Sequence, residues 1–93
     1  MNRTDDELVA LAAKAAGIDT RKPFAPLADD GDTFCLAVTL FMLVDVRKSA
    51  QITEVIGAAR GHLFRHAAPH GDDPAAATRR AIVEVAAQIG SAP

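Results

Sequence analysis

The sequence predicts a small α+β protein, with three α-helices and an antiparallel sheet of two to three strands in one domain, 1–93. Two segments near the ends of the chain, 5–16 and 74–89, space their apolar residues as amphipathic helices do. Between them, two runs rich in β-branched residues, 42–48 and 52–59, are joined by a short polar link, which is typical of an antiparallel hairpin. A chain of 93 residues has room for only one such core.

The first predicted helix, 5–16, has clear start and stop signals. Thr4 and Glu7 have the spacing of a capping box, in which each side chain binds the backbone N–H of the other residue. Gly17 offers a left-handed stop. Two prolines and a charged pair then make 19–28 a connection rather than a regular element.

The sharpest change of character lies at Asp29-Asp30-Gly31-Asp32, where a polar turn meets an apolar run. We expect a second helix at about 31–41. The three carboxylates could ligate a hard cation such as Ca²⁺ or Mg²⁺, but a calcium loop needs further oxygen ligands downstream, and the next residues are apolar. We therefore favour a structural motif, with a turn at Gly31 and a helix N-cap formed by Asp30 or Asp32.

The second predicted helix carries a broad apolar stripe, which indicates a helix buried on more than one side. Its members are Phe34, Ala37, Val38 and Phe41, with Leu36 and Leu40 beside them. Cys35 lies within this run and is expected as a small core residue. As the only cysteine it excludes an internal disulfide and fits a reducing compartment. The apolar run 34–46 is shorter than the ~20 residues that span a bilayer, so we expect no membrane association.

The last predicted helix, 74–89, has the most complete set of signals. Asp73 can cap it, Pro74 suits its first position, and Gly90 is expected to end it. Its arginines at 79 and 80 are expected on a solvated face. The segment 62–66 is the candidate for a third, short strand.

His62, His66 and His70 recur every four residues, which raises the question of a metal site. On one helix or one strand they would share a face. Gly61, Pro69 and Gly71 argue against one regular element through all three, and the spacing alone does not make ligands converge. We favour histidines in a solvated loop or strand and expect no metal or other cofactor.

Charge and motifs exclude several function classes. The net charge is −2, with acidic and basic residues scattered, so no basic face for nucleic acid is expected. A nucleic-acid-associated regulator remains the alternative. It would use Arg47, Lys48, Arg60, Arg65, Arg79 and Arg80. The two serines, Ser49 and Ser91, lie in a turn and a tail, and no phosphate-binding loop is present. The residues indicate no enzyme, no small-molecule substrate and, since the N-terminal segment is too acidic for a leader, a cytoplasmic location.

Three segments resemble a known family. Residues 26–32, with 36–40, resemble the "PL-x-DDGD…LAVKL" core of small phage and prophage proteins. Residues 77–83, with 86–90, are similar to their C-terminal "ATRRAIV…AAAEIG" helix, and 11–18 is similar to their N-terminal segment. The chain thus resembles the phage ABA-sandwich domain family. The resemblance implies α-β-α layers and a phage or prophage gene in a bacterial host, and it implies no catalytic residues.

The chain departs from that family in one place. Family members carry a Trp/Tyr-rich stretch between the first helix and the aspartate motif, where this chain has only 19–25, without Trp or Tyr. If that stretch is a hairpin of the sheet, the sheet here is smaller, and a bare two-stranded sheet is marginal. A third strand at 62–66 or a partner subunit would supply the missing cover. We therefore expect an accessory protein that acts by protein–protein contact, with a protein partner or as a homodimer.

Overall fold

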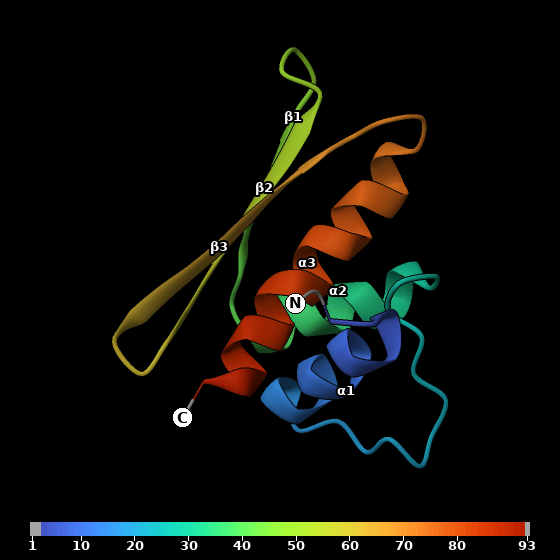
Figure 1. The fold of residues 1–93 in the computed structure, drawn as a ribbon, viewed down its shortest axis with the longest axis vertical. Helices are drawn as coiled ribbons and strands as arrows, with labels where there is room; N and C mark the ends of the chain where they lie inside the picture. The colour runs from blue at the N-terminus through green and yellow to red at the C-terminus, as the bar shows by residue number, and fades with distance from the viewer. Residues whose placement is uncertain (1–2, 93) are drawn as a thin grey trace.

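The computed structural model describes residues 3–92 and shows three α-helices and one antiparallel sheet (Figure 1). The elements are α1 (Asp5–Ala16), α2 (Asp30–Thr39), β1 (Leu43–Arg47), β2 (Ile52–Ala59), β3 (His62–Pro69) and α3 (Pro74–Ser91). The strands are ordered β1-β2-β3. The predicted α+β class, with three helices and a small antiparallel sheet, is confirmed.

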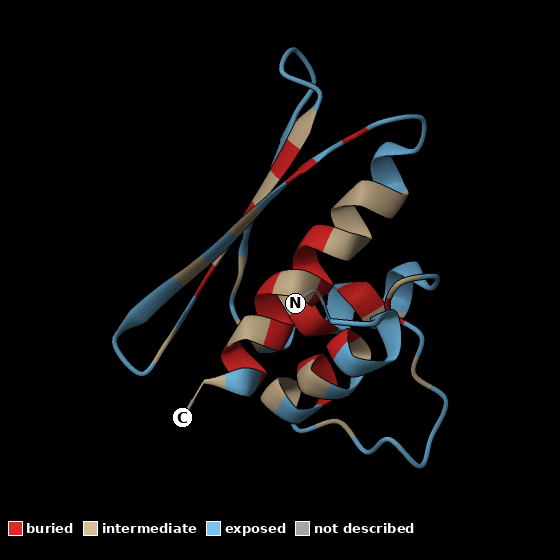
Figure 2. Ribbon diagram, viewed as in Figure 1, coloured by how far each residue is buried: buried red, intermediate tan, exposed pale blue. Residues whose placement is uncertain are grey.

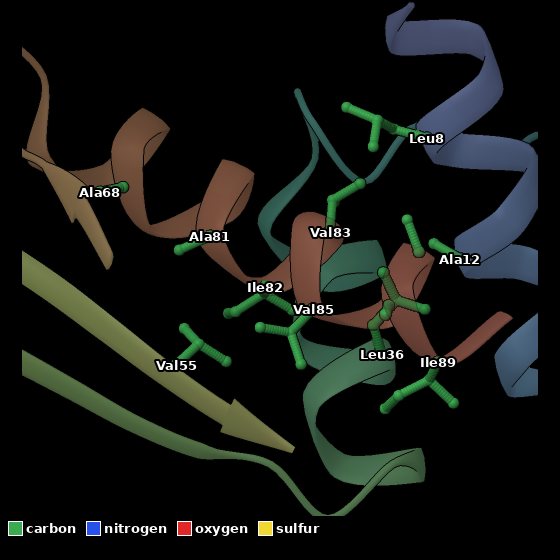
Figure 3. Packing of buried hydrophobic residues seen from close by; sticks show 12 residues of the cluster. Leu8, Ala12, Leu36, Val55, Ala68, Ala81, Ile82, Val83, Val85 and Ile89 are labelled. Atoms are coloured by element: carbon green, nitrogen blue, oxygen red, sulfur yellow. The ribbon is translucent and has the colours of Figure 1, made fainter. Parts of the chain in front are cut away.

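Helix α3 is the centre of the molecule, because it is buried on two sides (Figure 2). Ile82 and Val85 point toward Val55 of β2, whereas Val83 points toward Leu8 of α1 (Figure 3). Its buried residues are Ala81, Ile82, Val83, Val85, Ala86, Ala87, Ile89 and Gly90. The core is therefore continuous through α3, from the inner face of the sheet to α1 and α2.

The layers follow the order sheet, α3, then α1 and α2, so the helices lie on one side of the sheet (Figure 1). This order differs from the α-β-α layering that the family resemblance implied, in which helices cover both faces of the sheet. The opposite face carries Arg47, which forms ion pairs with Asp45 and Glu54, and also the exposed apolar side chains of Leu43 and Leu63. An antiparallel sheet can leave one of its faces to solvent.

The sheet consists of two consecutive hairpins. Arg60 and Gly61 join β2 to β3 with φ of 52° and 80°, the left-handed pair that a type I′ turn requires. The strand expected at 62–66 is present and continues to Pro69. Proline is tolerated there because β3 is an edge strand and position 69 faces away from β2.

The predicted helix ends are confirmed at α1 and at the start of α3. The Thr4 hydroxyl accepts the Glu7 N–H at 3.2 Å, and the Thr4 N–H donates to Glu7 Oε1 at 3.0 Å. These hydrogen bonds with Thr4 hold the pKa of the Glu7 carboxyl below its ordinary value. Gly17 ends α1 with φ of 69°, and Asp73 caps α3.

Gly90 does not end the last helix, so that prediction is wrong. The residue lies inside α3 and is buried, and the helix continues to Ser91. A Cβ at position 90 would overlap the carbonyl oxygen of Leu11 in α1. The two backbones therefore come together at this point, which only glycine permits.

We predict that Gly90→Ala lowers the free energy of unfolding by about 2–3 kcal/mol, because the new methyl group forces α1 away from α3. At an unconstrained helical site, glycine to alanine would stabilise the protein by about 1 kcal/mol. A loss of stability would therefore identify the close approach of α1 as the cause. Denaturant unfolding measures the change in the free energy of unfolding. Ala10→Gly, at an exposed position of α1, is the control that reports the difference in helix propensity alone. A stabilised Gly90→Ala variant would contradict the close crossing.

Candidate functional site

The aspartate motif is structural, and each carboxylate has its own partner. Asp29 is the N-cap of α2 and accepts the backbone N–H two residues on at 2.8 Å. The expected cap at Asp30 or Asp32 is therefore wrong. Asp30 instead binds Arg79 of α3 at 2.8 Å, and Asp32 accepts the Ala25 N–H at 2.8 Å. The three side chains thus fix the entry into α2 rather than converge on one point.

Arg79 links the aspartate motif to α3. Its Nε donates to the Leu27 carbonyl at 3.0 Å, while another guanidinium nitrogen binds Asp30. Its side chain is only 18% exposed, so the expected solvated face is wrong for this residue. The neighbouring Arg80 binds Asp5 of α1 at 2.6 Å, and this hydrogen bond raises the pKa of Arg80. The segments that carry the family resemblance therefore contact one another.

The three histidines occupy different environments. His62 is exposed and His66 is half-buried on the same face of β3, about 13 Å apart at the rise of a strand. His70 follows β3 and is buried against Thr53. Within residues 3–92, no cluster of three or more His, Cys, Asp or Glu side chains could hold a metal ion. The structure thus does not bring the histidines together.

His70 belongs to a buried polar chain. Its Nε2 lies 2.8 Å from the Thr53 hydroxyl of β2, which lies 2.8 Å from the Thr78 hydroxyl of α3. The chain ties the end of β3 to the sheet and to the start of α3. Sequence reasoning missed it, although the alternation that puts Thr53 on the same face of β2 as Val55 was a usable signal.

The basic residues of the nucleic-acid alternative come from separate parts of the fold. Arg47 of β1 binds Asp45 at 2.8 Å and Glu54 at 3.2 Å, and the hydrogen bond with Asp45 raises its pKa. Arg60 donates to the Ile89 carbonyl at the end of α3, at 3.0 Å. Arg79 and Arg80 are also paired internally, so four of the six cations bind groups of the fold itself. Lys48 and Arg65 are exposed.

The apolar stripe of α2 is on the surface. Phe34, Val38 and Phe41 are 69%, 54% and 91% exposed, so the expected burial on more than one side is wrong. Cys35 is also exposed and is not a core residue. Helix α2 packs on the core through its opposite side, with Leu36 fully buried, because α1 already covers much of α3 there.

These exposed side chains line a groove. Two adjoining hollows, of about 350 and 500 Å³, lie between α2, β1 and α3. Phe34 and Ile82 line both of them. The first extends to Val46, and the second extends to Val44 and Phe41. Together they form a continuous depression, here named the apolar groove.

Phe41 has an unusual backbone conformation. The Met42 N–H donates to the Ala37 carbonyl at 2.9 Å and the Phe41 N–H to the Val38 carbonyl at 3.2 Å, which is a Schellman motif. Phe41 occupies its left-handed position, with φ of 51°, where glycine is usual. A bulky side chain there costs free energy. The chain therefore holds an almost fully exposed ring in a strained conformation.

Strand β1 offers an unpaired edge beside the groove. The Gln51 carbonyl accepts the His70 N–H at 2.8 Å, so the odd-numbered residues of β2 bond toward β3. The even-numbered ones bond to β1, where they oppose odd-numbered residues. The N–H and C=O groups of Val44 and Val46 thus point away from the sheet. The edge of β3 is blocked by Pro69, whereas β1 has no proline.

We predict that Thr53→Val lowers the free energy of unfolding by about 2 kcal/mol, because the buried His70 and the half-buried Thr78 then lose their shared partner. Thr39→Val, at an exposed site of α2, is the matched control and should change stability by less than about 0.5 kcal/mol. Thermal and denaturant unfolding measure both. Equal effects of the two variants would show that the polar chain contributes nothing.

Among residues 3–92, no helix combines the length and the apolar character needed to cross a membrane. No protein-family model matches the chain, and no curated protein or solved structure matches it. The resemblance to the phage ABA-sandwich domain family stays a prediction.

Proposed function

We propose that the chain is a non-catalytic interaction domain that binds another polypeptide in the apolar groove and along the free edge of β1. One observation carries this proposal: Phe34, Val38 and Phe41 line a groove beside an unpaired strand edge while remaining more than half exposed. An added strand gains main-chain hydrogen bonds from such an edge, and its side chains fill the adjoining groove.

The lining of the groove favours binding over catalysis. The 500 Å³ hollow is lined by apolar residues alone. In the 350 Å³ hollow, the charged pair Asp30 and Arg79 is already bound together, and the hydroxyl of Thr33 donates to backbone carbonyls of the α2 entry. These polar groups are therefore committed to the fold, which leaves apolar contact as the chemistry of this surface.

The biological setting is part of the same proposal. An accessory role, a phage or prophage gene and the cytoplasm of a bacterial host are supported by the resemblance of 26–32 and 77–83 to phage proteins. The exposed single thiol of Cys35 fits a reducing compartment.

A photoreactive analogue at position 41 tests the proposal. With p-benzoylphenylalanine in place of Phe41, irradiation of expressing cells should give a discrete adduct whose cross-linked peptide identifies the bound chain, because the ring lies in the groove that binds it. The same analogue at Lys14, exposed on α1, is the control. Equal adduct yields at positions 41 and 14 would overturn the proposal.

We further predict that Phe41→Gly stabilises the isolated domain by about 0.5–1 kcal/mol, because glycine relieves the left-handed strain at φ of 51°. Phe41→Ala keeps that strain and should change stability by less than about 0.5 kcal/mol. Denaturant unfolding of dilute protein measures both. A destabilised Phe41→Gly variant would mean that the ring packs on its own chain, which would contradict its role as a contact for a partner.

A further inference from the structure

We propose that the polypeptide bound at this site is a second copy of the chain, whose β1 pairs antiparallel with the first β1 about a two-fold axis at Val46. This inference rests on the proposed function and names its partner. It follows from the order of side chains along β1 and from the direction of the free backbone groups.

The free backbone groups of β1 suit self-pairing. Val46 and Val44 direct their N–H and C=O groups away from β2. With the axis at Val46, the two Val46 residues exchange two hydrogen bonds. Val44 then lies opposite Lys48 of the partner subunit, which follows β1 and whose carbonyl already accepts from Gln51. The two sheets then form one continuous sheet of six strands.

The charges of β1 select this register. Directly opposed residues of antiparallel strands share a face, so Asp45 faces Arg47 of the partner subunit, twice per dimer. Moving the axis to Asp45 would place the two Asp45 carboxylates opposite each other, which is destabilising. Each guanidinium already binds its own Asp45 at 2.8 Å and Glu54 at 3.2 Å, and its five N–H donors leave capacity for one more carboxylate. The charges of β1 therefore favour the axis at Val46 over the axis at Asp45.

The apolar groove supplies the remaining contact area. Val46 is 57% exposed and lines the groove with Phe34. A partner strand beside Val46 would therefore shield both side chains from solvent. The exposed parts of Phe34 and Phe41 in two subunits offer roughly 600 Å² of apolar surface. A specific interface buries about 1,000 Å² or more, so the dimer would have to cover most of this surface as well as pair the strands.

Charge reversal with mixing tests the dimer. Asp45→Arg places arginine opposite Arg47, and Arg47→Asp places aspartate opposite Asp45, so each variant alone should dimerise at least about tenfold more weakly than the parent. An equimolar mixture makes both facing pairs Arg–Asp again. It should therefore form a heterodimer at least as tight as the parent dimer. Sedimentation equilibrium measures the dissociation constants, and circular dichroism checks that each variant is folded.

Asp19 and Arg21 provide the matched control, because they form an exposed ion pair of the same kind at 3.0 Å, outside β1 and the groove. Asp19→Arg and Arg21→Asp should leave dimerisation unchanged. A heterodimer from the mixture of β1 variants supports the inference. A parent chain that stays monomeric at a concentration 100-fold above the one used in the mixing experiment overturns the inference. A dimer whose dissociation constant does not change when the β1 charges are reversed also overturns it. If position 41 then still cross-links to a different chain, the proposed function survives and only the identity of the partner is wrong.

Discussion

The structure depends on the burial of α3 on two opposite sides. Toward the sheet the helix presents branched side chains such as Ile82 and Val85, which fill the space above β2 and β3. Toward α1 it presents Val83, and at Gly90 the two helix backbones come together. A chain of this size has only a thin core, so a helix that serves two interfaces makes that core continuous. Loss of either contact would separate the layers.

The same arrangement leaves one region uncovered. Helix α3 packs against β2 and β3 and not extensively against β1. The inner side chains of β1, Val44 and Val46, therefore line the groove and are not covered by α3. Helix α2 packs on the core with its Leu36 side and leaves Phe34 facing outward, and Phe41, just past its end, is also exposed. The apolar groove is the result, so the proposed binding surface follows from how the core is built.

Arg79 shows how the polar motifs serve this core. The guanidinium binds the Leu27 carbonyl and Asp30, so the turn before α2 is fixed to α3. Asp29 and Asp32 order the same turn from its two ends. A cluster of carboxylates that suggested cation binding is thus explained by three separate structural contacts. Their combined effect is to hold α2, and with it the apolar groove, at one position on α3.

Much of the fold could be predicted from sequence because its signals are local. The capping box at Thr4, the glycine stop at Gly17 and the alternation in β2 act within a few residues. The candidate site could not be predicted in this way. A stripe such as Phe34, Val38 and Phe41 has the same spacing whether it packs in a core or faces a groove, and only the tertiary neighbours decide which.

Amide hydrogen exchange at Val46 tests most sharply whether a second strand is added to the edge of β1. The Val46 N–H points away from its own sheet and would bond only to an added strand. The N–H groups of Asp45 and Arg47, which bond to β2, serve as internal references. We expect protection of the references at all protein concentrations and protection of Val46 that rises as the protein associates. A Val46 amide that exchanges freely in the associated protein would show that no strand is added to β1.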